Sequence, residues 1–186
     1  MKKILILGSG GSGKSTLAKW MGDLLNIEVV HPDYYYWKPN WVETSKDEWN
    51  KKISILLAKN NWIMDGNWTG SLQYRIEFSD TIIFLDYPRF ISIWRIIKRY
   101  CKYHGKTRPD MGVGCIEKID YEFLKWIWDY NSNIKPKINQ LIRQAQNNKR
   151  IIVIKNNQEL LQLKTNLQKN ISNLKKDERD FSCPSL

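Results

Sequence analysis

The stretch that most constrains the fold is ILILGSGGSGKST, residues 4–16 of the 186-residue chain. An apolar run ends abruptly in glycines, and the segment from Gly8 to Ser15 matches G-x-x-x-x-G-K-[ST] between an expected strand and an expected helix. Glycines let successive backbone N–H groups point inward at an anion, and the helix that follows directs the positive end of its dipole to the same place. The stretch therefore predicts a phosphate-binding loop.

Two side chains of this loop have separate chemical roles. Lys14 has the length and charge to reach the outer phosphates, and the Ser15 hydroxyl is a suitable ligand for Mg²⁺. The residues that we expect to surround the phosphates are Gly8, Ser9, Gly10, Gly11, Ser12, Gly13, Lys14, Ser15 and Thr16.

Apolar runs along the chain predict a parallel sheet. They are nearly continuous rather than alternating, as expected for strands that are covered on both faces. The runs lie at residues 4–7, 27–30, 62–64, 81–85 and 150–154. Helical patterns lie between them at residues 14–25, 45–60, 88–104 and 119–147, and a polar helical pattern follows at 158–175. This alternation predicts an α/β fold with helices on both faces of the sheet.

Polar side chains follow the strands at the edge where parallel sheets bind ligands. Asp65, after the third run, is our first choice to hold the water shell of a metal, because Mg²⁺ prefers oxygen ligands and keeps much of its water. Asp86, after the fourth run, is the competing choice, although we favour it as the cap of the helix that begins near Pro88.

Asp33 follows the second run and precedes a group of aromatic rings. These rings are Tyr34, Tyr35, Tyr36, Trp37 and Trp41. A carboxylate beside planar rings predicts an acceptor site in which Asp33 takes the proton of an attacking hydroxyl. The alternative is that the rings only pack and that Asp33 stabilises a turn after Pro32. For His31 we favour a buried ring with a backbone partner over a role as a ligand.

Positive charge is concentrated between residues 89 and 108. Arg95, Lys98, Arg99 and Lys102 recur at helical spacing, and the glycine- and proline-rich loop GKTRPDMGVG follows at 105–114. Fixed arginines stabilise the charge of a transferring phosphoryl group and exclude water from it, so we predict a lid at residues 95–120. An ordinary solvated basic helix is the alternative. Residues 119–131 carry an aromatic stripe that we assign to the core.

Composition limits the classes of partner without choosing among them. The net charge is +11, which permits binding to nucleic acid, an anionic membrane or phosphorylated small molecules. No apolar stretch has membrane-spanning length, and a strand that the fold needs begins at once, so we expect no membrane segment and no signal peptide. Cys101, Cys115 and Cys183 are widely spaced, which favours reduced thiols in the cytoplasm. Cys101, His104 and Cys115, with Asp110 or Asp120, match no strong zinc pattern.

The ordered motifs resemble a known group of proteins over roughly residues 1–155. These motifs are GSGGSGKST, HPDYYYWKPNWVE, WIMDGNW, FLDYPR, WRIIKR, GKTRPDM and YEFLKWIWDY. They are similar to the P-loop nucleotide kinases related to adenylate kinase, and more closely to the DNA topology modulation proteins, the FlaR-like family. The resemblance implies a three-layer P-loop NTPase fold with five parallel strands in the order 2-3-1-4-5 and a lid after the fourth strand. We expect a kinase-like domain at 1–160 and a C-terminal helix with a frayed tail at 161–186.

The resemblance also implies roles for single residues. Asp65 and Gly66 match a DG motif that lies beside the acceptor phosphate and the metal in adenylate kinase-like enzymes. Arg95 and Arg99 match two lid arginines four residues apart, and Arg108 is a further lid cation. Arg75 is similar to an arginine that approaches the acceptor phosphate. Asn67 and Trp68 stand where adenylate kinases have Phe-Pro-Arg, so AMP is not implied as the acceptor.

These observations together predict an ATP-dependent phosphotransferase of the nucleoside or nucleotide kinase type that uses Mg²⁺. Its acceptor is a nucleotide, a nucleoside or another small hydroxyl compound. The expected catalytic residues are Lys14, Asp33, Arg95, Arg99 and Arg108, the acceptor residues Asp33, Trp37, Asp65, Gly66, Asn67 and Arg75, and the metal ligands Ser15 and Asp65. One alternative is an ATP-binding regulator associated with nucleic acid, for which no DNA-reading motif is present. A second is an ATP-binding interaction module with negligible turnover.

Overall fold

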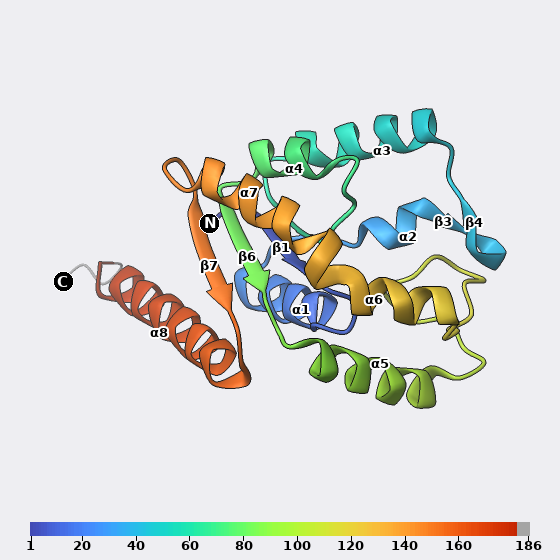
Figure 1. Cartoon of the computed structure of the whole chain (residues 1–186). Helices are drawn as coiled ribbons and strands as arrows, with labels where there is room; N and C mark the ends of the chain where they lie inside the picture. The colour runs from blue at the N-terminus through green and yellow to red at the C-terminus, as the bar shows by residue number, and fades with distance from the viewer. Residues whose placement is uncertain (182–186) are drawn as a thin grey trace.

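A five-stranded parallel sheet places the glycine-rich loop at the centre of the molecule (Figure 1). The computed structural model describes the backbone of residues 1–181 and the side chains of residues 1–173. The strands are β1 (Lys3–Gly8), β2 (Val29–Val30), β5 (Trp62–Asp65), β6 (Thr81–Leu85) and β7 (Arg150–Ile154). Their spatial order is β2-β5-β1-β6-β7, which confirms the predicted order 2-3-1-4-5.

The central strand β1 serves both faces of the sheet, because successive residues of a strand point in opposite directions. Leu5 and Leu7 pack with helices on one face, and Ile4 and Ile6 pack with helices on the other. The first face is covered by α3 (Lys46–Ala58), α4 (Leu72–Phe78) and α7 (Lys135–Ala145), and the second by α1 (Lys14–Leu25) and α8 (Asn157–Phe181). The fold therefore has three layers.

Local sequence signals set the ends of several helices. Gly13 precedes α1 with a left-handed φ of 97°, and Asn26 ends the helix in the left-handed conformation. The Ser45 hydroxyl accepts a hydrogen bond from the backbone N–H of Glu48 at the start of α3, and Asp120 accepts one from Phe123 at the start of α6 (Tyr121–Asn133). These side chains satisfy N–H groups that the first turn of a helix leaves unpaired.

The helix predicted at residues 119–147 is two helices. α6 ends before Ile134, and α7 begins at Lys135 with Pro136 in its first turn. Proline has no N–H and its ring clashes with the carbonyl four residues earlier, so one continuous helix is excluded there.

The sequence pattern did not predict the short elements between β2 and α3. They are α2 (Pro32–Tyr36), β3 (Trp37–Lys38), a 3₁₀ turn (Pro39–Trp41) and β4 (Val42–Glu43). α4 was also missed. Each of them spans at most two helical turns, too few for a repeating apolar pattern to show.

Two expectations about helix ends need correction. Asp86 does not cap α5 (Arg89–Tyr103), because Pro88 occupies the N-cap position and the Asp86 carboxylate pairs with Lys135 Nζ at 2.7 Å. α8 continues to Phe181, beyond the predicted end at 175. The last part of the predicted frayed tail, including Cys183, lies outside the described residues.

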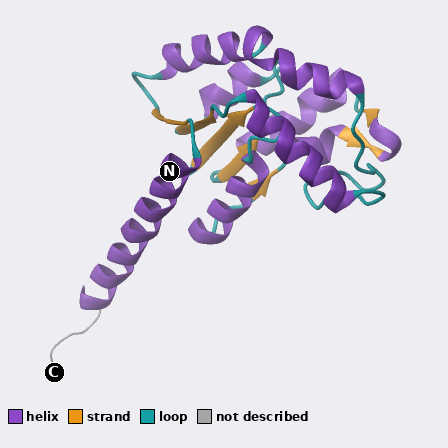
Figure 2. Cartoon of the chain, turned by 60° about the horizontal axis from the view of Figure 1, so that its bottom comes forward, coloured by secondary structure: helices purple, strands orange, loops and turns teal. Residues whose placement is uncertain are grey.

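The predicted lid at residues 95–120 corresponds to the second part of α5 and to the connecting loop at residues 104–120, which we call the lid loop. Figure 2 shows this loop beside the short β3–β4 ladder. Asn40 N donates to the Gly114 carbonyl at 3.1 Å, and Trp41 Nε1 donates to the Ile116 carbonyl at 2.8 Å. The lid loop is thus docked on the segment that follows β2. Among the helices that the structure describes, none combines the length and apolar character needed to cross a membrane.

Candidate functional site

The loop between β1 and α1 has the conformation that its glycines permit. Gly11 has a φ of 75°, and a Cβ there would collide with the Ser92 carbonyl of α5. On the other side of the loop, the Asn67 amide holds both backbone groups of Gly8: Oδ1 accepts from Gly8 N at 3.2 Å, and Nδ2 donates to Gly8 O at 2.8 Å. The loop is therefore held between α5 and the residues that follow β5.

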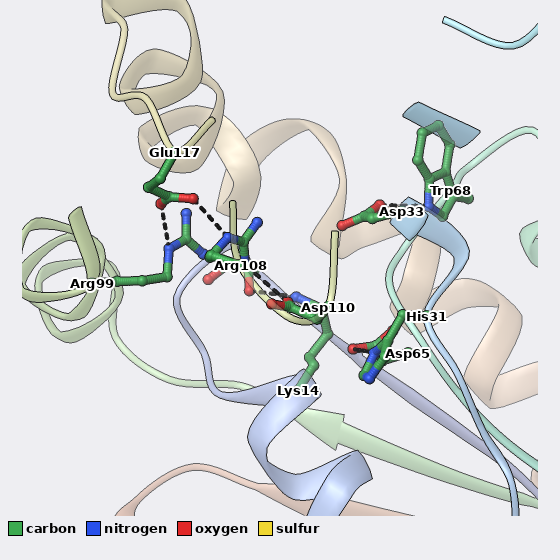
Figure 3. Close-up of polar contacts among 10 residues, drawn as sticks. Lys14, His31, Asp33, Asp65, Trp68, Arg99, Arg108, Asp110 and Glu117 are labelled. Carbon is green, nitrogen blue, oxygen red and sulfur yellow. Dashed lines mark hydrogen bonds and ion pairs between the residues drawn. The ribbon is translucent and has the colours of Figure 1, made fainter. Parts of the chain in front are cut away.

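Lys14 begins α1 and stands at the centre of the charged groups (Figure 3). Its Nζ donates to the Ser9 carbonyl at 2.8 Å. Burial, with some help from Arg99 and Arg108, lowers the pKa of Lys14, while Asp65 and Asp33 act against that shift. Figure 3 shows Asp33 and Asp65 on one side of Lys14 and Arg99 and Arg108 on the other, so two carboxylates and two arginines act on one ammonium group.

Asp65 ends β5 and lies beside Ser15, its predicted partner in metal binding. Burial opposes ionisation of Asp65, but His31, the Ser15 hydroxyl and Lys14 outweigh it and lower the pKa of the carboxyl. His31 Nδ1 lies 3.1 Å from Asp65 Oδ2. His31 therefore has a carboxylate partner rather than the backbone partner that we expected.

Asp33 lies in the first turn of α2 and faces the same space. Its Oδ1 accepts a hydrogen bond from Trp68 Nε1 at 3.0 Å. Burial and the nearby Asp65 raise the pKa of the Asp33 carboxyl, against the effects of Lys14, Arg108 and the Trp68 hydrogen bond. A raised pKa makes a carboxylate a better acceptor of a hydroxyl proton. Asp33 is held by a side chain and does not merely stabilise a turn.

The lid supplies two arginines that meet on one buried acid, Glu117 (Figure 3). Arg99 Nε donates to Glu117 Oε1 at 2.7 Å, and Arg108 Nε forms an ion pair with Oε2 at 2.6 Å. Arg108 also donates to Asp110 at 2.9 Å. The sequence analysis did not single out Glu117, and nothing in the mixed acidic and basic stretch CIEKIDYE that follows the lid glycines distinguishes it from its neighbours.

Arg95 lies one helical turn before Arg99 and makes different contacts. Its guanidinium donates to the Ser12 carbonyl at 3.0 Å and to Asn157 Oδ1 at 2.8 Å, and it stacks 4.4 Å from the Tyr87 ring. Arg95 therefore supports the outer side of the phosphate loop and is not part of the group around Lys14.

Three of the predicted acceptor residues differ in what they contact. Arg75 is fully buried, and its guanidinium donates to the Gly66 carbonyl at 2.9 Å and to the Asn67 carbonyl at 2.5 Å. In this conformation Arg75 shapes the loop after β5 and does not reach a ligand. Asn67 is buried against Gly8, as described above. Trp37 is half-buried and packs against Trp68, with ring centroids 6.3 Å apart.

The aromatic stripe of α6 is only partly a core. Ile127 and Tyr130 are buried, whereas Tyr121, Trp126 and Trp128 are 78%, 39% and 47% exposed, so our assignment of the stripe to the core was wrong for those three rings. Phe123 lies against Gly10, within 3.3 Å of where a Cβ would stand. The inner side of α6 therefore covers the phosphate loop.

Nothing among the described residues favours zinc. In that part of the chain no group of three or more His, Cys, Asp or Glu side chains is placed to hold a metal ion. Cys115 is buried with its Sγ 3.3 Å from the Lys38 carbonyl, and Cys101 is exposed on α5.

Comparison by sequence does not assign the chain to a family. No known protein-family model matches the chain. It is 26% identical over 136 residues to the uncharacterized protein YqaC of Bacillus subtilis (strain 168), covering 70% of this chain and 74% of that protein. The resemblance to the DNA topology modulation proteins stays a prediction.

Two solved structures of shikimate kinases share the whole architecture. The enzyme from Acinetobacter baumannii, in complex with shikimate, has a TM-score of 0.59 at 14% identity, covering 93% of this chain and 94% of that one. The enzyme from Bacteroides thetaiotaomicron has a TM-score of 0.55 at 15% identity, covering 91% and 97%. At this level of identity the likeness concerns the fold alone. The chain has the fold of the P-loop small-molecule kinases.

Proposed function

We propose that the chain is an ATP-dependent phosphotransferase that moves the γ-phosphoryl group of ATP to a hydroxyl of a small acceptor. The observation that carries this proposal is the convergence on Lys14 of two carboxylates, Asp33 and Asp65, and two lid arginines, Arg99 and Arg108. A phosphate loop alone fits any nucleotide-binding protein. Cations on one side of the ammonium group and a proton acceptor on the other are what phosphoryl transfer to a hydroxyl requires.

The residues divide the work by position. The backbone N–H groups of the loop from Gly8 to Thr16 bind the phosphates, and Lys14 neutralises the outer ones. Arg99 and Arg108 offset the charge that spreads over the equatorial oxygens during transfer. Arg95 keeps the loop in place through the Ser12 carbonyl.

Mg²⁺ fits the donor set beside the loop. The Ser15 hydroxyl and the Asp65 carboxylate are both oxygen ligands, they lie next to each other, and Asp65 is buried with a lowered pKa that keeps it ionised. When bound there, the ion would neutralise part of the charge on the phosphate oxygens. The His31 ring also contacts the Asp65 carboxylate and orients it.

The first test compares the chain with Lys14→Ala. We expect a non-hydrolysable ATP analogue to raise the melting temperature of the unchanged protein by mass action, and to stabilise Lys14→Ala much less. In a phosphate-transfer assay over a panel of acceptors, turnover on the order of 1 per second is expected for the unchanged chain. Full ATP affinity and turnover in Lys14→Ala would rule out the assignment of the site. Absence of any turnover would favour an ATP-binding interaction module.

A second candidate function, binding of nucleic acid, is favoured by one surface. The outer face of α5 exposes Phe90 and Trp94, which are 68% and 61% exposed, and Lys98 Nζ lies 5.3 Å from the Trp94 ring. Exposed rings with adjacent cations are suited to stacking on single-stranded bases. Binding of a fluorescent single-stranded DNA should then weaken steeply as salt rises. A flat salt profile, or no binding near physiological salt, would remove this function.

A further inference from the structure

We infer that the acceptor is an uncharged hydroxyl compound with a planar face, of the nucleoside class, and not a nucleoside monophosphate or a carboxylic acid. The inference rests on the proposed function and narrows it. It follows from the charges and rings that surround Asp33, the residue that faces the acceptor.

The first observation is that the cations of the acceptor side are already engaged. The basic residues between β2 and β6 are Lys38, Lys46, Lys51, Lys52, Lys59 and Arg75. Lys38 and Lys52 both pair with Glu48 at 2.8 Å, and Lys59 pairs with Glu28 at 2.7 Å.

The remaining three cations of that set do not offer a ligand a charged contact at the site. Arg75 is fully buried, with its guanidinium on the carbonyls of residues 66–68. Lys46 and Lys51 are exposed on α3. Arg75 lies close enough to Asp33 and Asp65 to act on their charges, but a phosphate or carboxylate on the acceptor would have to displace the carbonyl groups from its guanidinium to pair with it, and burial of an unpaired anion is costly.

The second observation is that the lid arginines already have acidic partners and that the proposed function assigns them to the donor phosphates. Glu117 is buried and touches both Arg99 and Arg108, and Asp110 holds a further nitrogen of Arg108. Glu117 and Asp110 thus contact three nitrogens of the two guanidinium groups, and the proposed function assigns the remaining N–H groups of both arginines to ATP. An acceptor phosphate would compete with ATP for the same two side chains.

The third observation is the repulsion that an anionic acceptor would meet. Asp33 and Asp65 lie in the same part of the site (Figure 3), and the charge of Asp65 raises the pKa of the Asp33 carboxyl. A phosphate as the reacting group would lie beside both carboxylates, and like charges at such distances repel strongly in a partly buried site. A neutral hydroxyl meets no such repulsion and donates a hydrogen bond to Asp33.

The fourth observation is that the uncharged surface beside Asp33 consists of aromatic rings. Trp68 stands at its centre, with centroids 4.0 Å from Tyr36, 5.3 Å from Trp49 and 6.3 Å from Trp37. Trp68 has a φ of 25°, a strained value for a bulky residue, and its indole N–H is held by Asp33. A strained backbone conformation persists only where the surrounding structure holds it, and such conformations cluster at functional sites. The half-buried rings of Trp37 and Trp68 offer a planar base a stacking surface.

The transfer balances with a neutral acceptor. The hydroxyl oxygen of the nucleoside forms a bond to the γ-phosphorus, and the bond from that phosphorus to the β–γ bridging oxygen breaks. ADP leaves with the electron pair of that bond, and the hydroxyl proton passes to the Asp33 carboxylate.

The test uses matched pairs of acceptors on the full chain with ATP and Mg²⁺. Adenosine and thymidine are compared with their 5′-monophosphates and with shikimate, by production of ADP and by thermal shift beside a non-hydrolysable ATP analogue. We expect kcat/KM for at least one nucleoside to exceed that for its monophosphate and for shikimate by about 100-fold, the ratio that about 2.7 kcal/mol of discrimination produces. Asp33→Asn should lower kcat for the nucleoside far more than it weakens binding, whereas Lys46→Ala should change neither.

The outcomes separate this inference from the proposed function. Transfer to a monophosphate or to shikimate with equal or higher efficiency would overturn the inference and leave the phosphotransferase standing. A Lys46→Ala variant that loses acceptor affinity would also overturn it, because a surface cation would then be holding an anion. No ATP binding, or no transfer to any acceptor of the panel, would overturn both.

Discussion

At the scale of single residues, Glu117 contacts both lid arginines and orients them. Glu117→Gln keeps the size of the side chain and removes its charge, so Arg99 and Arg108 lose their common anchor. We expect kcat with a nucleoside acceptor to fall about tenfold while ATP affinity changes less than about threefold, because orientation matters most in the transition state. The free energy of unfolding should fall by about 2 kcal/mol, less than for a fully buried pair because Arg99 is partly exposed.

Kinetics and urea denaturation of Glu117→Gln check this prediction. Glu122→Gln is the matched control, since Glu122 is exposed on the first turn of α6. Equal kcat values in the two variants would show that Glu117 has no part in orienting the arginines.

His31 predicts a pH dependence of stability. Burial alone would lower the pKa of His31, but the hydrogen bond and charge of Asp65, with Asp110 and Asp33 nearby, raise it above the ordinary value of 6.5. A pKa raised by folding means that the protonated ring stabilises the fold below 6.5, and that this contribution is lost as pH rises through the folded-state pKa. The free energy of unfolding, measured with urea in the absence of Mg²⁺, should therefore fall as pH rises above 6.5 and through the folded-state pKa.

His31→Asn provides the comparison, because it keeps a polar side chain and cannot titrate. Its unfolding free energy should show a smaller fall over the same interval. Identical pH profiles in the two proteins would mean that the contact with Asp65 contributes nothing to the folded state.

At the scale of elements, a substitution at Gly112 tests how closely the lid loop packs on the segment after β2. A Cβ at Gly112 would lie 2.5 Å from the Trp37 carbonyl and 3.2 Å from the Tyr34 carbonyl, at a position without a left-handed φ. Gly112→Ala should therefore push the lid loop away from the segment after β2 for steric reasons alone. Trypsin should cleave after Lys106 or Lys118 several-fold faster in this variant.

Gly70→Ala is the control for that experiment, because a Cβ at Gly70 would meet nothing within 4 Å. Unchanged cleavage in both variants would contradict the close packing of the lid loop.

Short elements also mark the limit of prediction from sequence. The four long strands and the helices α1, α3 and α5 were predicted nearly to the residue, because each strand is a nearly continuous apolar run and each helix repeats an apolar period over enough positions. The ladder of β3 and β4 has two residues in each strand and is held by contacts across the 3₁₀ turn, including Trp37 against Trp41 at 5.6 Å. Such contacts leave no periodic signal.

At the scale of the whole molecule, α8 completes the core on one face of the sheet. Leu163 and Leu167 are buried in the cluster that includes Ile4 and Ile6 of β1. Leu163→Ala should lower the free energy of unfolding by about 2 kcal/mol, since it removes apolar contacts and leaves a cavity.

Leu161→Ala, on the same helix, is the control, because Leu161 is 64% exposed and its change should stay within about 0.5 kcal/mol. Chemical denaturation of both variants measures the difference. Equal stabilities would mean that α8 does not pack on the sheet.

The resemblance of the motifs to P-loop kinases implied the strand order. The sequence by itself determined the parallel sheet and the phosphate loop, and it singled out most of the residues that gather around Lys14. The reason is that these features depend on local signals, namely apolar runs, glycines and polar residues at the carboxyl ends of strands. Only the tertiary structure decided that His31 pairs with Asp65, that Arg75 lies beneath the loop, and that Glu117 joins Arg99 to Arg108. Those contacts join residues 8 to 34 positions apart, and their partners are chosen by packing and burial, which no single stretch of the chain encodes.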